Sequence, residues 1–202
     1  MYSAHDFIQY MAEAESYCCS DVLKSFPGLR NGSTFVCELH EAPKLLRKEL
    51  NKLFVDRHDI ESGALSVITM SQKTANDMSC WSDEMEAERE QLTEHFFAAA
   101  KEICARLKSE GLWGDFIDPS SGTPYFGTHT NTTMFETDEK YRLLGFRIED
   151  LGCCKVICHR EFGRNVFVGT IVTNAASRSG VIDEIFEDLK LKLGTNSSQN
   201  AS

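Results

Sequence analysis

The apolar residues of the chain recur at two spacings, and these spacings predict that strands and helices alternate along most of its length. Runs rich in β-branched and aromatic residues predict four strands, at 34–39, 64–71, 155–159 and 166–173, and a further short strand followed by a tight polar turn is expected within 111–122. Apolar residues three and four positions apart predict three helices, at 43–54, 82–110 and 179–193. We expect an α+β (mixed α/β) fold with a single sheet flanked by helices, in which the last two strands pair antiparallel.

The longest predicted helix carries signals at both ends. Ser82 is suited to cap its N-terminus, acidic residues fill its first turn, and Gly111 follows its last turn. A shorter helix is expected to end at Leu144, with Thr137 or Asp138 as its N-cap. These signals place the ends of the two helices independently of the apolar pattern.

The region 113–139 has little helical periodicity and is rich in glycine, threonine and aromatic residues. A long irregular segment in a compact domain is commonly functional, so we expect this one to shape a partner-facing surface. We expect residues 1–33 to form an N-terminal arm, 34–193 to form one globular domain, and 194–202 to form a flexible polar tail.

Composition excludes several classes of function. The formal net charge is -10, and an acidic chain repels the phosphates of nucleic acid. No apolar run approaches the roughly 20 residues that span a bilayer, and no secretory signal pattern opens the chain. We therefore expect a cytoplasmic protein without nucleic-acid or membrane partners, in which the eight cysteines are reduced.

Two adjacent cysteines mark the stretch 150–157 as the strongest candidate for chemistry. Gly152 permits a sharp turn into the predicted strand. Strand alternation would place Cys154 on a small apolar face that suits the core, and Cys153 on a more exposed face with Lys155. A nearby ammonium favours the thiolate, the form that attacks electrophiles and binds metals.

Other interpretations of these residues remain open. Both thiols could be buried and inert, since free cysteine packs as a small apolar residue. A thiol enzyme would use His129 or His159 as the base for Cys153. A zinc-stabilised interaction domain would use Cys153, Cys154, Cys158 and His159, although adjacent cysteines fit tetrahedral ligation poorly.

Few other chemical motifs are present. The sequence lacks the phosphate-binding glycine loops, the HExxH zinc motif and the GxSxG nucleophile motif. Asp115 and Asp118 could form the carboxylate pair of a glycosidase-type site, but aspartates in such a setting more commonly hold turns. The cysteine-containing stretch therefore remains the leading candidate.

A series of short sequence motifs occurs in order between residues 34 and 175: QKT (72–74), NDM (76–78), WS (81–82), AKEIC (100–104), DFIDPSSG (115–122), FETDE (135–139), LGF (144–146) and DLGCCKVI (150–157). In these motifs the sequence resembles CblD, the methylmalonic aciduria and homocystinuria type D family of intracellular vitamin B12 trafficking.

The resemblance implies a fold similar to that of flavin-dependent nitroreductases, but without flavin and without enzyme activity. It implies a partner, CblC, that holds and processes cobalamin, while the chain alone binds no cofactor. It also implies two destinations for the cofactor, methionine synthase and methylmalonyl-CoA mutase. A form with a leader would be mitochondrial, whereas we expect the present sequence to act in the cytoplasm.

The resemblance further implies roles for the residues of the glycine-cysteine-cysteine motif and for the lysine that follows it. Cys153 would supply a thiolate to the cobalt of cobalamin held on CblC. Gly152 would give the corrin room to approach, and Lys155 would favour the thiolate. Cys154 is the alternate ligand, with packing as its expected role.

Overall fold

The computed structural model describes the backbone of residues 24–27 and the complete residues 35–187. The centre of the fold is a five-stranded sheet in which every neighbouring pair is antiparallel. In spatial order its strands are β1 (Lys24–Pro27), β2 (Phe35–Glu41), β3 (Ser66–Lys73), β7 (Val166–Thr173) and β4 (Gly114–Ile117). All eight residues of β7 are buried, because the strand is paired on both edges and covered on both faces.

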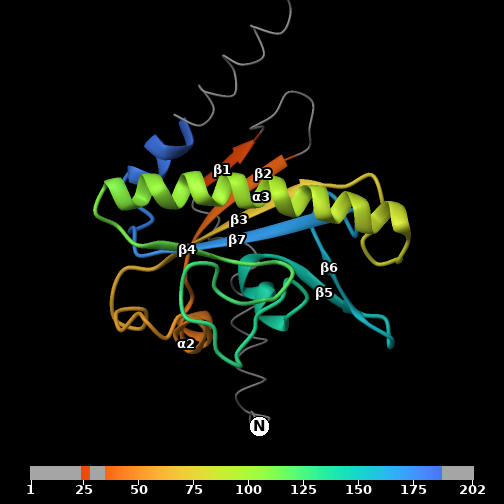
Figure 1. Ribbon diagram of the computed structural model, residues 1–202, viewed down its shortest axis with the longest axis horizontal. Coiled ribbons are helices and arrows are strands. Elements are labelled where there is room, and N and C mark those ends of the chain that lie inside the picture. The colour runs from red at the N-terminus through yellow and green to blue at the C-terminus, as the bar shows by residue number, and fades with distance from the viewer. Residues whose placement is uncertain (1–23, 28–34, 188–202) are drawn as a thin grey trace, which may run out of the picture.

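One face of the sheet is covered by the 27-residue helix α3 (Asp83–Ser109), which crosses the strands from one side of the molecule to the other (Figure 1). The Ser82 hydroxyl accepts a hydrogen bond from the amide of Met85 at 3.1 Å, which confirms the predicted N-cap. A helical segment at 181–187 packs into the same core. This core contains Leu39, Ile68, Phe96, Ile103, Leu107, Phe116, Ile171, Ile182 and Phe186.

The opposite face carries α2 (Lys44–Leu53), the 3₁₀ helix η1 (Glu139–Leu144) and a two-stranded antiparallel hairpin (Figure 1). The hairpin consists of β5 (Arg147–Asp150) and β6 (Lys155–Cys158). Asp138 caps η1 by accepting the amide of Lys140 at 3.0 Å, as one of the two predicted caps requires. The second core, between these elements and the sheet, contains Leu46, Leu50, Leu53, Val67, Ile117, Leu144, Ile157 and Val172.

The mixed α/β class is confirmed, but the predicted arrangement of the strands is wrong. The described residues form two sheets instead of one, and β6 pairs with β5 instead of with β7. Strand β5 escaped prediction because its four residues include three charged side chains. Strand β1, which lies inside the predicted N-terminal arm, pairs with β2 at the sheet edge.

The predicted helix 179–193 is described only as far as residue 187, and the tail 194–202 lies outside the described residues, as does the arm apart from β1. Among the helices that the structure describes, none is long and apolar enough to cross a membrane. The implied likeness to the nitroreductase fold stays a prediction.

A buried polar group lies on the face of the sheet opposite α3. The ring Nε2 of His40 is 3.2 Å from the Thr69 hydroxyl, and Glu38 forms an ion pair with Arg160, which follows β6. Burial, with the charge of Arg160, lowers the pKa of His40 to about 4, so the ring is neutral at physiological pH. These contacts connect the hairpin segment to β2.

The burial of His40 predicts a pH dependence of stability. An unfolded histidine has a pKa of about 6.5, so the unfolded chain binds more protons than the folded chain between about pH 6.5 and 4. Stability is therefore expected to fall as the pH is lowered through this window, by about 3 kcal/mol in total once the pH lies below the folded-state pKa of His40. Urea denaturation of the wild type and of His40→Gln would measure the difference.

The variant isolates His40, because the raised pKa of Glu38 acts in the opposite direction and is present in both proteins. The free energy of unfolding should depend less steeply on pH in His40→Gln. Parallel pH profiles for the two proteins would contradict the assignment.

A second prediction concerns the contact between β7 and α3. A Cβ atom added at Gly169 would lie 2.2 Å from Phe96 Cδ2, so Gly169→Ala is expected to lower the free energy of unfolding by about 1–3 kcal/mol. Adding Phe96→Leu should relieve part of the overlap, and the double variant should lose less than the sum of the two single changes. Simple additivity in urea denaturation would argue against the steric explanation.

Candidate functional site

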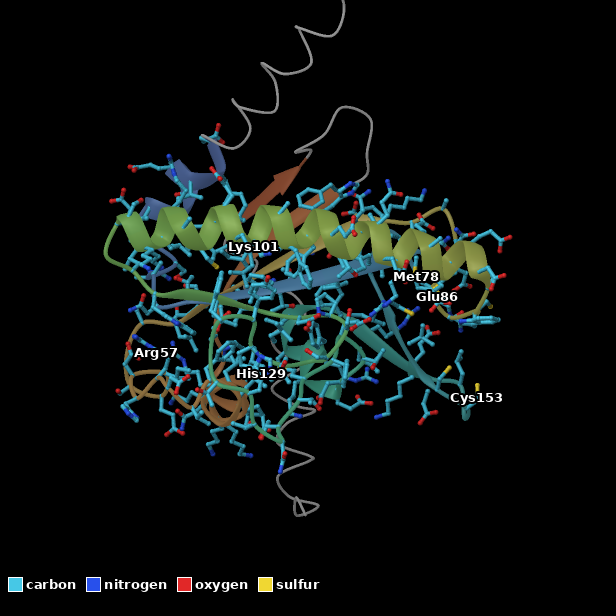
Figure 2. The ribbon with its side chains drawn as sticks, in the orientation of Figure 1. Arg57, Met78, Glu86, Lys101, His129 and Cys153 are labelled. Carbon is cyan, nitrogen blue, oxygen red and sulfur yellow. The ribbon has the colours of Figure 1, made fainter. Side chains whose placement is uncertain are left out.

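The β5–β6 hairpin presents the vicinal cysteines at its outer end, on the periphery of the molecule (Figure 2). Asp150 and Lys155 form its last residue pair, and the amide of Leu151 donates to the carbonyl of Cys154 at 2.9 Å. The amide of Gly152 donates to the Asp150 carboxylate at 2.8 Å, and the φ of Gly152 is 84°, a left-handed value that glycine adopts readily. The sequence therefore closes a tight loop that carries both thiols.

Both Cys153 and Cys154 are exposed, and their sulfur atoms are 3.7 Å apart. The expectation that Cys154 packs in the core is wrong. Strand β6 begins only at Lys155 and the first buried residue is Val156, so Cys154 still belongs to the loop. The expected exposure of Cys153 is confirmed.

Electrostatics distinguish the two thiols. The hydrogen bond with Cys153 raises the pKa of Cys154, and desolvation and the negative charge of Asp150 raise it further. The Lys155 ammonium is 2.8 Å from a Glu139 carboxylate oxygen, which neutralises much of the charge that Lys155 would present to the loop. The expectation that Lys155 favours the Cys153 thiolate therefore stays a prediction.

Ion pairs hold the hairpin against the rest of the fold. Glu139 of η1 accepts from both Lys155 of β6 and Arg142, at 2.8 and 2.5 Å. On the other strand, β5, Glu149 pairs with Arg164 at 2.7 Å. Each strand is thus tied to a different part of the chain, which positions the loop between them.

The loop between β3 and α3, residues 74–82, lies beside the hairpin. It contains exposed residues for which the sequence alone predicted no function. The amide of Met78 donates to the carbonyl of Arg164 at 3.3 Å, and Cys80 is exposed and close enough to act on the pKa of Cys154. Trp81 is 75% exposed, the most exposed large apolar side chain in the described part of the structure. Trp81 belongs to the WS motif that contributes to the family resemblance, but nothing in the sequence connected this residue with the cysteines.

The residues of the alternative sites do not converge. His129 lies far from Cys153 (Figure 2). His159 is buried and stacks on Phe162, and it follows Cys154 by five residues, about 16 Å along an extended strand. Across the described ranges, no three His, Cys, Asp or Glu side chains are arranged to hold a metal ion, and Cys158 is buried away from the exposed pair.

The two aspartates considered as a carboxylate pair hold turns. Buried Asp115 accepts the amides of Phe126 and Gly127 at 3.0 Å each, and Asp118 accepts the amide of Ser120 at 2.8 Å. These bonds organise the long segment that follows β4. They account for both carboxylates without a catalytic role.

The long segment also borders a groove of about 650 Å³ beside α3. Arg89 crosses the groove to Glu136 at 2.6 Å, and Phe135 at its edge is 40% exposed. Three further acidic residues line it, Glu86, Glu90 and Glu94. This groove is separate from the loop that carries the thiols. The expectation that the long segment faces a partner stays a prediction.

The fold and the site together define a mixed α/β protein that presents two adjacent thiols on a surface hairpin. The family model for the methylmalonic aciduria and homocystinuria type D protein matches residues 3–186. The chain therefore belongs to this family, as the sequence words predicted.

Curated relatives agree with the family match. The chain is 52% identical over 149 residues to the cobalamin trafficking protein CblD of Homo sapiens, covering 74% of this chain and 49% of that protein. It is 50% identical to the Mus musculus protein of the same name with the same coverage. It is 45% identical to that of Gallus gallus over 90% of this chain and 62% of that protein. The chain thus spans about half the length of the mammalian relatives.

The exposure of Cys154 predicts that replacing it costs little stability. Cys154→Ser should change the free energy of unfolding by less than about 0.5 kcal/mol, since its thiol already contacts water. Cys37→Ser is the matched contrast, because it places a hydroxyl on a fully buried apolar face and should destabilise by about 1–3 kcal/mol. Urea denaturation measures both, and equal losses would show that Cys154 is buried in solution.

Proposed function

We propose that the chain is a non-enzymatic adaptor of cobalamin trafficking, in which the Cys153 thiolate binds the cobalt of cobalamin carried by CblC. The relatives named cobalamin trafficking protein CblD support the pathway. The observation that carries the site is the exposed thiol pair at the end of a braced hairpin. The cobalt is cargo held by the partner, and the chain alone holds neither flavin nor metal in this proposal.

The position of the loop suits a ligand that must reach a cofactor on another protein. A thiol in a cleft could not approach cobalt inside a second protein without a large rearrangement, whereas a thiol at the end of a hairpin can enter the partner's pocket. Gly152 adds no side chain beside Cys153, and the space around its Cα is open. The anchored strands keep the position of the loop defined during the approach.

The chemistry suits cobalt. A thiolate is a soft ligand, and a cobalt–sulfur bond between two proteins would retain the cofactor during transfer. Cys154 is the less suitable ligand, because its pKa is raised by Cys153 and by the nearby negative charges. In the proposal Cys153 is therefore the ligand, and Cys154 is its hydrogen-bonded neighbour.

The adaptor would direct cobalamin toward both methionine synthase and methylmalonyl-CoA mutase. Such a role needs surfaces for proteins in addition to a ligand for cobalt. Trp81 and Leu151, which are 75% and 40% exposed, are apolar side chains in the two loops beside the thiols. They are suited to contact CblC around the cobalt, since apolar residues enrich the centres of protein interfaces.

The test is a spectral titration of cobalamin-loaded CblC with the chain. Cys153→Ser should abolish the cobalt–sulfur absorption, and the matched variant Cys154→Ser should retain it, since only Cys153 is the proposed ligand. The rate of bond formation should rise with pH toward about 8.5, the range in which free thiols ionise, because thiolate is the binding form.

Circular dichroism and a binding assay with CblC serve as controls for folding and for the protein–protein contact. The assignment fails if Cys154→Ser loses the cobalt–sulfur spectrum while Cys153→Ser keeps it. It also fails if neither replacement changes the spectrum in protein that folds and binds CblC.

A further inference from the structure

The two exposed thiols are arranged for chemistry with each other as well as with an external ligand. Their sulfur atoms are 3.7 Å apart, both are open to solvent, and they share a loop that contains Gly152. We propose that the pair is a thiol–disulfide exchange site for low-molecular-weight disulfides of the glutathione type, with Cys153 attacking and Cys154 resolving. This inference goes beyond the cobalt-binding role and does not depend on it.

The geometry of the loop divides these roles. Gly152 precedes Cys153 and has open space beside its Cα, so a bulky disulfide can approach the Cys153 sulfur. Cys154 lies next to the strand, where its carbonyl accepts the amide of Leu151 at 2.9 Å, and its sulfur is 3.7 Å from that of Cys153. Cys153 therefore attacks first, and Cys154 is placed to resolve the mixed disulfide.

The exchange balances in two steps. The Cys153 thiolate attacks one sulfur of oxidised glutathione, a protein–glutathione disulfide forms, and one glutathione leaves as its thiolate. Cys154 then gives its proton to water and attacks the Cys153 sulfur, so a Cys153–Cys154 disulfide forms and a second glutathione leaves. The pair has lost two electrons and two protons, and oxidised glutathione has been reduced to two glutathione molecules.

The product should be readily reversed. Consecutive Cα atoms are about 3.8 Å apart across a trans peptide, whereas ordinary disulfides join Cα atoms about 4.4–6.8 Å apart, so a disulfide between adjacent residues is strained. Strained, exposed disulfides are the ones that thiols reduce easily. An excess of reduced glutathione would therefore return the pair to two thiols, which makes the site responsive to the ratio of oxidised to reduced glutathione.

A third thiol, Cys80, is an alternative to Cys154 as the resolving thiol. Cys80 is exposed in a loop that is hydrogen-bonded to the segment after β6, so it is the other thiol that could resolve the mixed disulfide. The direct contact of 3.7 Å is with Cys154, and we expect that thiol to react. The two outcomes give different peptides after digestion.

The sequence makes the experiment unusually specific. Trypsin cleaves after Arg147 and Lys155, so the peptide 148–155 contains both cysteines of the pair and no other. Cys158 falls in the peptide 156–160 and Cys80 in 74–89. Mass spectrometry of each peptide therefore reports on one thiol site at a time.

The full chain is incubated with oxidised glutathione, quenched by alkylation at low pH and digested. In the wild type, peptide 148–155 should lose two hydrogen atoms and carry neither glutathione nor alkyl group. In Cys154→Ser the same peptide should keep one glutathionyl group, because the resolving thiol is absent. Cys153→Ser should react at least about tenfold more slowly, since the remaining thiol lies next to strand β6 instead of beside the open Gly152.

Cys80→Ser should leave the wild-type result unchanged, and the buried Cys37 and Cys104 should stay unmodified in folded protein. The proposal is overturned if wild-type peptide 148–155 retains glutathione, is linked to peptide 74–89, or does not react. It is also overturned if Cys154→Ser carries no glutathionyl group on this peptide. The readout needs neither cobalamin nor CblC, so its failure is distinguishable from a failure of the proposed function.

Discussion

The pairing of β7 on both edges is the constraint on which the position of the thiols depends. Eight residue pairs join β7 to β3, and four more join it to β4. No edge of β7 is left for β6, although a short connection brings the two strands close in sequence. Strand β6 therefore pairs with β5 in a separate hairpin, and the loop between them extends to the edge of the molecule (Figure 2).

Charged side chains make this hairpin a defined element despite its short strands. A two-stranded ribbon is marginal alone in water, so it needs support from the rest of the fold. Ile148 and Ile157 are buried in the core between the hairpin and the sheet, and Lys155 and Glu149 tie its two strands to Glu139 and Arg164. The loop is consequently both exposed and held in a fixed position. A residue that binds the cofactor of another protein requires both properties.

The two proposals assign different reactions to the same sulfur atoms. A Cys153 thiolate that is free can bind a soft metal, whereas a Cys153 sulfur in a disulfide has no thiolate to offer. If both proposals hold, oxidation of the pair would interrupt cobalt binding until reduction restores it. The neighbouring Cys154 would then serve cobalt transfer indirectly, by setting the redox conditions under which the ligand is available.

The sequence by itself determined the local features, because caps and apolar periodicity act over a few residues. Ser82, the α3 stripe and β7 were all predicted correctly. Its motifs placed the chain in its family, and the predicted exposure of Cys153 is confirmed, although the pair lies in a loop where strand alternation does not apply. Only the tertiary structure decided which strands pair, that Cys154 lies outside β6, and that Cys80 and Trp81 lie in a loop beside the hairpin. Those features depend on contacts between residues far apart in the chain, which local patterns do not encode.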